Sequence, residues 1–137
     1  MLIATLTSSY NRKKYTLKSI GQLHSDLLSE DIKLRHYLVD DCSVDGTPEL
    51  VEKYFSDVKV IKTSGDLYWS RSMKLGWEMI KKDVIPDFLF VYNDDTDFYP
   101  NCISRLLETY YEQTKLLKKQ CVITGALVDP IHNYPTY

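Results

Sequence analysis

Long apolar runs, paired cysteines and an excess of one charge are all missing from this sequence of 137 residues. No apolar stretch approaches the roughly 20 residues that a membrane-spanning helix needs. Met1 leads directly into a short apolar segment, with no basic stretch before it that would indicate a signal peptide. We therefore expect a cytoplasmic protein without a transmembrane segment, and leave contact with a membrane surface open.

Cysteine and net charge exclude two further classes of protein. Cys42, Cys102 and Cys121 are odd in number and far apart, and no two of them have a metal-binding spacing. We expect free thiols in a reducing compartment. The formal net charge is only −2, so the sequence has no electrostatic footprint of a nucleic-acid-binding protein.

What the sequence does contain is a regular alternation of strand-like and helix-like segments. The predicted strands cover residues 2–7, 34–39, 58–61, 88–92 and 121–124, and the predicted helices cover 17–28, 48–55, 69–80 and 103–117. This order predicts one α/β domain over residues 1–137, with a mostly parallel sheet covered by helices on both faces. The run 88–92 is almost continuously apolar, which predicts a strand buried on both faces.

Polar residues follow three of the predicted strands. They occupy positions 7–11 after the first strand, 40–43 after the second and 93–97 after the fourth. Ligands of open α/β sheets bind in the crevice outside the carboxyl ends of the strands. The sequence therefore predicts that these three segments converge on one binding site.

The most informative of these segments is Asn93-Asp94-Asp95-Thr96-Asp97, which places three carboxylates within four residues. Clustered carboxylates repel one another unless a positive charge compensates them, and their oxygen atoms suit Mg²⁺ or Mn²⁺. Such a cation would bind a diphosphate and neutralise its charge. The alternative interpretation is an acidic turn that caps the following helix.

The other two segments allow two interpretations each. A carboxylate of the pair Asp40-Asp41 could accept a hydrogen bond from a nucleobase or a ribose hydroxyl, or the pair could form an Asx-type turn. Tyr10 could stack on a base, or it could be an ordinary aromatic residue at the rim of the core. The residues alone leave both choices open.

Four segments, taken in order, resemble the motifs of a known family. They are LTSSYNR at 6–12, YLVDDCSVDGT at 37–47, GDLYWS at 65–70 with the later Gly76, and YNDDT at 92–96. These segments resemble GT-A glycosyltransferases of family 2, including the rhamnosyltransferase-like members. The resemblance implies a GT-A fold, of which this chain would be the Rossmann-like nucleotide-binding half.

The resemblance also implies a reaction and the residues that serve it. A sugar would pass from a nucleoside diphosphate sugar to an unidentified hydroxyl acceptor, such as a glycan or a lipid-linked glycan, with inversion at the anomeric carbon. Tyr10 would stack on the base, Asp41 would hydrogen-bond it, and Asp94 would contact the ribose or the sugar. Thr7 and Ser8 would belong to the same nucleotide-binding site, and Asp95 would ligate Mg²⁺ or Mn²⁺.

The chain differs from the family in length. Members continue well beyond this point, and their additional residues carry the acceptor site and the catalytic base. We therefore expect a chain truncated at its C-terminus that holds donor and metal but lacks the base. One alternative is a catalytically silent nucleotide-sugar-binding module. A sugar nucleotidyltransferase is a weaker alternative, because its first loop would contain glycine and residues 7–12 contain none.

Overall fold

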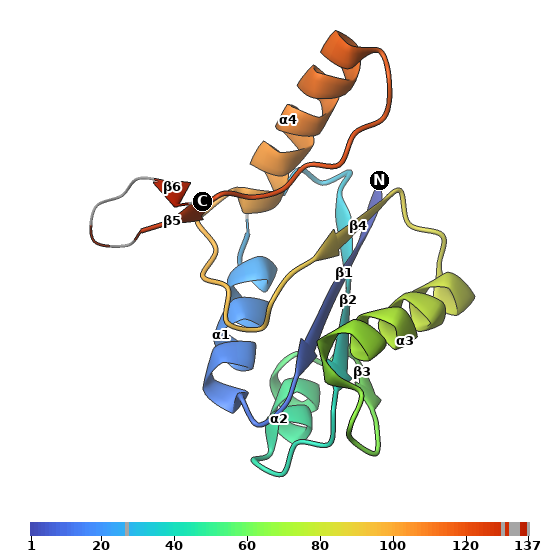
Figure 1. Ribbon diagram of the computed structural model, residues 1–137, viewed down its shortest axis with the longest axis vertical. Helices are drawn as coiled ribbons and strands as arrows, with labels where there is room; N and C mark the ends of the chain where they lie inside the picture. Colours follow the sequence, from blue (N-terminus) through green and yellow to red (C-terminus); the bar gives the residue numbers. More distant parts are fainter. Residues whose placement is uncertain (27, 130, 132–134, 137) are drawn as a thin grey trace. The chain divides into compact units, whose positions relative to one another are not determined.

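The computed structural model describes residues 1–26, 28–129, 131 and 135–136 (Figure 1). They form two compact units, one made of Met1–Ser25 and Ser29–Phe98, the other of Asp26–Leu28 and the chain from Tyr99 onward. The first unit contains β1 (Leu2–Ser9), α1 (Lys13–His24), β2 (Lys33–Asp40), α2 (Thr47–Tyr54), β3 (Lys59–Lys62), α3 (Tyr68–Asp83) and β4 (Phe88–Val91). The second contains α4 (Cys102–Leu117), β5 (Leu127–Val128) and β6 (Pro135–Thr136).

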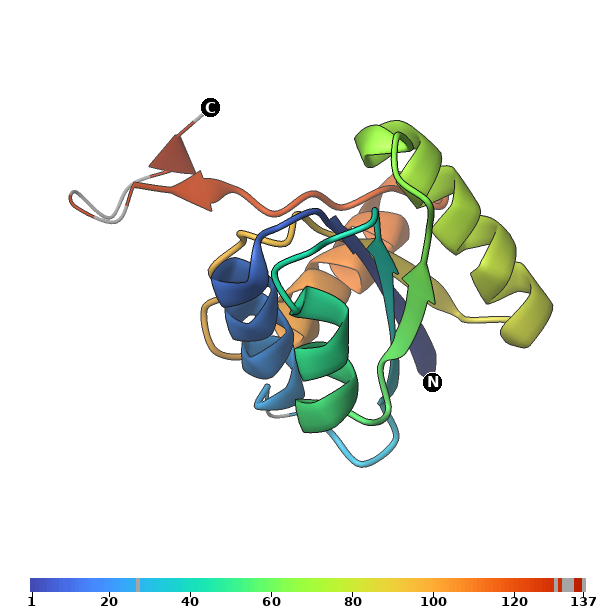
Figure 2. The ribbon, with the colours of Figure 1, turned by 90° about the horizontal axis from the view of Figure 1, so that it is seen from below.

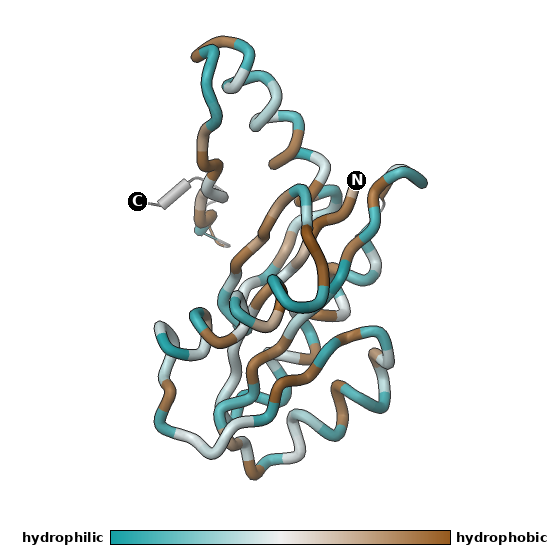
Figure 3. Tube along the Cα trace, turned by 90° about the vertical axis from the view of Figure 1, so that its right-hand side faces the viewer, coloured by the Kyte–Doolittle hydropathy of each residue, from teal (hydrophilic) through white to brown (hydrophobic). Residues whose placement is uncertain are grey.

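The first unit is a parallel four-stranded sheet with helices on both faces, as the alternation of elements predicts. The strand order is β3-β2-β1-β4, and all three neighbouring pairs are parallel. Helices α1 and α2 cover one face and α3 covers the other (Figure 2). The most hydrophobic parts of the trace run along these strands (Figure 3). This arrangement brings the carboxyl ends of all four strands to one edge.

Among the described residues, an apolar cluster packs on each face of the sheet. Side chains alternate between faces along a strand, so Tyr37 and Val39 of β2 point toward α3 while Leu38 points toward α1 and α2. The α3 side contains Ala4, Leu6, Tyr37, Val39 and Ile80, with Ile61, Met73, Leu75 and Val84 packed against them. The opposite side contains Ile20, Leu38, Val51 and Val58, with Leu17, Phe55 and Val60.

Gly76 allows α3 to pack closely on this sheet. A Cβ atom at this position would lie 2.3 Å from Cδ1 of Leu6 and 3.1 Å from Cγ2 of Val39. Both of these neighbours are buried core residues. The glycine therefore sets the distance between the helix and the strands.

Two predicted strands differ from the structure. The strand over 88–92 is not buried on both faces: β4 pairs with β1 at the edge of the sheet that the described residues form, and its Leu89 and Val91 are exposed. The predicted fifth strand over 121–124 is wrong, because residues 121–126 form no strand. The short strands β5 and β6 instead pair with each other, antiparallel, in the second unit. Apolar composition predicted both strands, but it does not show which runs find a neighbouring strand.

Helix α4 of the second unit is capped by a residue far away in the sequence. The Asp26 carboxylate accepts hydrogen bonds from the backbone N–H of Asn101, at 2.6 Å, and of Ile103, at 3.2 Å. The first N–H groups of α4 therefore bond to a carboxylate of their own unit, a role that the alternative interpretation gives to the acidic segment 93–97. In the part of the chain that the structure describes, no helix combines the length and apolar character needed to cross a membrane.

Candidate functional site

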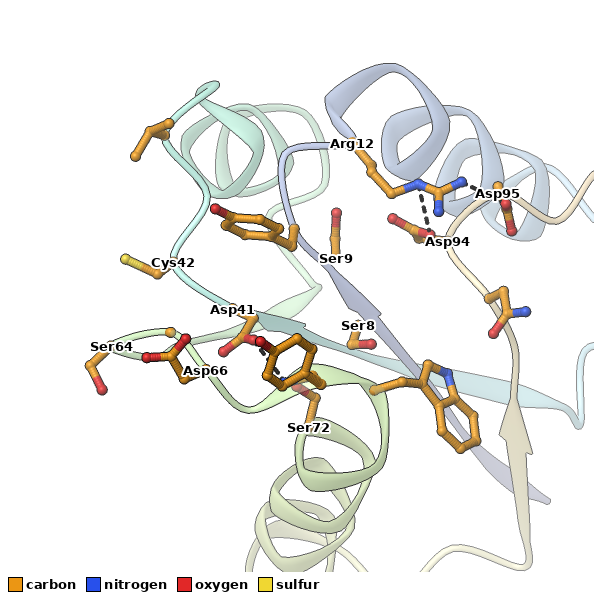
Figure 4. Close-up of a pocket in the computed structure, with 16 residues that line it drawn as sticks. Ser8, Ser9, Arg12, Asp41, Cys42, Ser64, Asp66, Ser72, Asp94 and Asp95 are labelled. Atoms are coloured by element: carbon orange, nitrogen blue, oxygen red, sulfur yellow. Dashed lines mark hydrogen bonds and ion pairs between the residues drawn. The ribbon is translucent and has the colours of Figure 1, made fainter.

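A pocket of about 790 Å³ lies at the carboxyl ends of the strands, within the range typical of small-molecule sites. Residues that follow each of the four strands line it, together with the first turns of α3 (Figure 4). They are Ser8, Ser9, Tyr10, Arg12, Asp41, Cys42, Val44, Ser64, Gly65, Asp66, Tyr68, Trp69, Ser72, Asn93, Asp94 and Asp95. The three segments expected to converge therefore do lie together, and the loop after β3 completes the wall.

Of the six residues expected in a nucleotide and metal site, five line this pocket. They are Ser8, Tyr10, Asp41, Asp94 and Asp95. Thr7 is not among the lining residues, because its side chain is fully buried and points to the face of β1 opposite that of Ser8. The Thr7 hydroxyl has no hydrogen-bond partner among the described residues.

The acidic segment forms an ion-pair cluster with Arg12. Nη2 of Arg12 lies 2.5 Å from Oδ2 of Asp95, and its Nε lies 3.4 Å from Oδ1 of Asp94. The hydrogen bond that Arg12 donates to Asp95 is the main reason why the pKa of Arg12 is raised. Asp97, the third acid of the segment, pairs instead with Lys18 of α1. The cluster at the pocket thus contains two carboxylates rather than the three that the sequence suggests.

The two carboxylates of the cluster differ sharply in their exposure. The side chain of Asp94 is 6% exposed, whereas that of Asp95 is 43% exposed. Burial raises the pKa of Asp94, and the charge of Arg12 and hydrogen bonds from Ser9 and Thr16 partly offset this effect. Asp95 is therefore the more accessible anion, and Asp94 is the one held in place by neighbouring side chains.

These oxygen atoms fit a hard divalent cation. Mg²⁺ usually takes one or two protein carboxylates and completes its shell with water and phosphate oxygens. Asp94 and Asp95 offer two carboxylates beside a pocket large enough for a phosphate-bearing ligand. The donor set is therefore compatible with a hard divalent cation.

A second group of potential metal ligands fits an ion less well. His24, His36 and Asp57 bring three ligand atoms within 4.8 Å of one another, outside the pocket. The two imidazole rings are stacked, with centroids 4.4 Å apart and planes inclined by 20°. Because the lone pairs of imidazole nitrogens lie in the ring plane, stacked rings direct them side by side rather than toward one ion.

Asp41 is buried beneath the pocket and holds the loop after β3. Its Oδ1 accepts a hydrogen bond from the Thr63 hydroxyl at 2.8 Å, and its Oδ2 accepts one from the Tyr68 N–H at 3.0 Å. The Leu67 N–H is shared between both oxygens, at 3.2 and 3.0 Å. A carboxylate has about four acceptor sites, and these four contacts use two at each oxygen. A ligand N–H at Asp41 would therefore share an oxygen with the loop, most readily in place of one of the two bonds from Leu67.

The loops after β1 and β2 are fastened to each other at the rim of the pocket. The Asn11 N–H donates to the Ser43 hydroxyl at 2.9 Å, and the Asn11 side chain accepts from the Val44 N–H at 2.8 Å. The Asp45 carboxylate accepts from the Lys13 N–H at 3.0 Å. The polar residues of the two sequence segments thus bond to each other, which fixes the shape of this side of the pocket.

Several residues around the pocket have backbone conformations that L-amino acids rarely adopt. Asn11, Cys42, Asp66 and Tyr68 have φ values of 53°, 69°, 65° and 55°. Such conformations cost about 1–3 kcal/mol each and persist only where the surroundings enforce them. The hydrogen bonds of Asp41 and Asn11 supply that enforcement here. Strain gathered in the loops of one pocket is typical of a functional site.

Three exposed aromatic residues and one unpartnered hydroxyl complete the lining. Tyr10, Tyr68 and Trp69 are all exposed, and they offer ring faces to a planar or apolar ligand surface. Ser72 is buried, and its Oγ has no hydrogen-bond partner among the described residues. A polar ligand atom could satisfy this hydroxyl.

The sequence did not identify Arg12, Trp69 and Ser72 as members of the site. One signal for Arg12 was present: it is a basic residue directly after a predicted strand, at the same sheet edge as the acidic segment. Trp69 belongs to the GDLYWS motif at 65–70, but the apolar stripe of its helix predicts packing for it, and nothing in the sequence indicates Ser72. Only the position of α3 against the sheet brings them to the site.

Comparisons with known proteins agree with this geometry. The family model described as "Glycosyl transferase family 2" matches residues 5–123. No curated protein gives a significant match to the chain. Among solved structures, Staphylococcus aureus TarS 1–349 in complex with UDP-GlcNAc has a TM-score of 0.65 at 18% identity, covering 84% of this chain and 32% of that one.

A second solved structure has the same fold. The mannosyltransferase PcManGT from Pyrobaculum calidifontis, in complex with GDP-Man and Mn²⁺, has a TM-score of 0.65 at 12% identity, covering 77% of this chain and 31% of that one. At such low identity these likenesses show the fold alone. The chain spans at most about a third of the length of these structures.

Proposed function

The chain belongs to glycosyl transferase family 2, and we propose that its pocket binds a nucleoside diphosphate sugar together with Mg²⁺ or Mn²⁺. The observation that carries this proposal is the pairing of two features across one strand-end pocket. Asp94 and Asp95 offer carboxylates on one side, while Tyr10 and Asp41 offer a ring face and a hydrogen-bond acceptor on the other. A nucleoside diphosphate presents matching groups, since it has a planar base with N–H donors at one end and a cation-binding diphosphate at the other.

The roles of the base-binding residues follow from the ring face or polar atom that each side chain presents to the pocket. Tyr10 has an exposed ring and can stack on a base. Asp41 would accept a base N–H at an oxygen that it shares with the loop, and Ser8 adds a hydroxyl to the lining of the pocket. The TarS and PcManGT structures contain UDP-GlcNAc and GDP-Man respectively, which supports the ligand class and leaves the base open.

The diphosphate end would be held by the acidic pair and its neighbour. Asp95 is the exposed carboxylate and would be the protein ligand of the metal, while Asp94 would contact the ribose or the sugar. A bound divalent cation would supply neutralisation of the charge on the departing diphosphate. For the whole enzyme we propose transfer to a hydroxyl acceptor with inversion, in which a base deprotonates the acceptor. We assign neither the acceptor site nor this base to residues of this chain.

Metal-linked nucleotide binding is the direct test of the proposal. Titration calorimetry with UDP, GDP, dTDP and CDP, each with and without Mn²⁺, measures the choice of base and the metal dependence together. At about 100 times its dissociation constant, the preferred nucleotide should stabilise the fold by about 2.7 kcal/mol. Absence of binding by every nucleotide at millimolar concentration with Mn²⁺ present would refute the proposal.

Asp95→Asn should abolish the metal-dependent part of this binding and change the free energy of unfolding by less than about 1 kcal/mol, because the Arg12–Asp95 pair is partly exposed. Asp97→Asn is the matched control, since it removes the same charge two residues further on from a carboxylate that pairs with Lys18. Equal metal dependence in both variants would exclude Asp95 as the ligand. If a nucleoside diphosphate sugar binds but no acceptor leads to its cleavage, the result would favour the alternative of a catalytically silent nucleotide-sugar-binding module.

A further inference from the structure

Resting on the proposed function, we infer that Arg12 is a built-in competitor of the divalent cation. In the free protein its guanidinium group occupies the acidic pair Asp94–Asp95. When metal and diphosphate bind together, the guanidinium leaves the carboxylates and pairs with the phosphate oxygens. The chain would therefore bind the metal poorly alone and well in company with its diphosphate ligand.

The contacts of Arg12 place it where a metal would be bound. Its Nη2 lies 2.5 Å from Oδ2 of Asp95, the more exposed of the two carboxylates of the acidic pair, and Asp95 lines the pocket. A Mg²⁺ ion bound to this carboxylate would be a second cation on an anion that already pairs with Arg12. Charges of the same sign repel, and each cation neutralises the carboxylate that attracts the other. The guanidinium and the ion therefore compete for Asp95.

Arg12 can leave without disturbing the fold. Its backbone is fixed, because its carbonyl oxygen accepts hydrogen bonds from the N–H groups of Tyr15 and Thr16, both at 3.0 Å, at the start of α1. Its side chain is 42% exposed, and all its ion-pair contacts are with the acidic pair. Because the backbone of Arg12 is fixed and its side chain is partly exposed, the guanidinium can change its position while α1 stays in place.

The destination of the guanidinium follows from its chemistry. Arg12 lines the pocket that we propose for the diphosphate. A planar guanidinium with five N–H donors binds phosphate oxygens in a bidentate manner. Since the diphosphate both releases Arg12 from the carboxylates and brings oxygens to the metal, the two ligands should assist each other's binding. Such coupling is reciprocal by thermodynamic necessity.

The test compares Arg12→Gln with Lys18→Gln. Each variant loses one positive charge that faces the acidic segment, but the carboxylate with which Lys18 pairs is Asp97, and not the proposed metal ligand. Binding of Mn²⁺ alone is measured first, by electron paramagnetic resonance of the free ion. Binding of inorganic pyrophosphate preloaded with Mn²⁺ is measured second, by calorimetry, because this probe carries a diphosphate without a base.

We expect opposite changes in the two measurements. Arg12→Gln should bind Mn²⁺ alone about tenfold more tightly than the parent, because no guanidinium competes for Asp94 and Asp95. It should bind Mn²⁺-pyrophosphate several-fold more weakly, because the phosphate oxygens lose a guanidinium. Lys18→Gln should resemble the parent in both. Equal affinity of both variants for Mn²⁺, or weaker binding by Arg12→Gln, overturns the inference.

A measurement on the parent protein keeps the inference testable if Arg12→Gln does not fold. Nitrogen-15 NMR of the arginine Nε–H groups follows the Arg12 side chain directly. Mg²⁺ with pyrophosphate should shift its resonance and Mg²⁺ alone should do so only at much higher concentration, whereas a resonance unmoved at saturation refutes the exchange of partners. If the parent binds no nucleoside diphosphate but Arg12→Gln still gains affinity for Mn²⁺, the proposed function fails and the competition stands.

Discussion

His36 should make the fold sensitive to mild acid. It lies on β2 and is only 3% exposed, with Nδ1 2.8 Å from the Thr5 hydroxyl and its ring stacked on that of His24. Burial is the main cause that lowers the pKa of His36 from 6.5 to about 4. The nearby His24 lowers it further, and Asp57 raises it slightly.

The sign and size of the effect follow from this pKa. In the unfolded chain His36 takes up a proton near pH 6.5, whereas in the folded protein it does so only near pH 4. The neutral form is thus favoured by folding, and its stabilisation is present above pH 6.5 and is lost as the pH falls toward 4. The difference of 6.5 − 4 = 2.5 units corresponds to about 3 kcal/mol in total. About 2 kcal/mol of this should be lost at pH 5.

Urea unfolding at pH 7 and pH 5 measures this loss. In His36→Asn the side-chain amide can replace Nδ1 toward Thr5 and does not titrate, so its stability should fall by about 2 kcal/mol less than that of the parent. His24→Asn is the matched control and should retain most of the parent's pH dependence. Carboxylates such as Asp94, whose raised pKa acts with the opposite sign, are common to all three proteins and cancel in the comparison. Parallel pH profiles for the parent and His36→Asn would refute the argument.

Two further substitutions test the packing beneath the pocket. Gly76→Ala should lower the free energy of unfolding by about 1 kcal/mol, because overpacking against Leu6 costs more than the gain in helix propensity. Urea unfolding measures this change. A stabilised variant would contradict the close approach of α3 to the sheet. Asp41→Asn should cost about 1–3 kcal/mol, because an amide cannot accept on both sides from Thr63 and Tyr68. It should also weaken nucleotide binding in calorimetry, and a variant with the stability of the parent would show that Asp41 does not hold the loop.

The sequence predicts the layout of the sheet well because that layout depends on local patterns. Alternation of strands and helices is sufficient to predict a parallel sheet with two covered faces, and the carboxyl ends of parallel strands then share an edge. The same reasoning brings Asp41 and Asp94 to one pocket. It fails for β4 and for residues 121–124, because exposure and pairing of a strand depend on its neighbours and not on its own composition.

The partners of individual charged residues are beyond what sequence spacing can predict. Asp94, Asp95 and Asp97 are near-identical in sequence context, yet the fold buries the first, pairs the second with Arg12 and turns the third to Lys18. The side on which each carboxylate emerges depends on the turn after β4 and on the position of α1. A motif therefore indicates that a charged site exists, while its counter-ion is decided by tertiary structure.

Asp41 and Asp95 each follow another polar residue near the end of a strand, but their contacts in the structure differ: Asp41 supports a loop, and Asp95 forms an ion pair. Asp41 already accepts three donors from a loop that contains the strained residue Tyr68, so any base it binds adds to a structural role. Asp95 is half-exposed, and its ion pair with Arg12 can be exchanged for another cation. Loss of Asp41 should therefore lower stability and affinity together, whereas loss of Asp95 should lower only the metal-dependent affinity. Comparing the change in unfolding free energy with the change in binding affinity for each variant therefore separates a residue that shapes the pocket from one that binds the ligand. The family motif alone does not make that distinction.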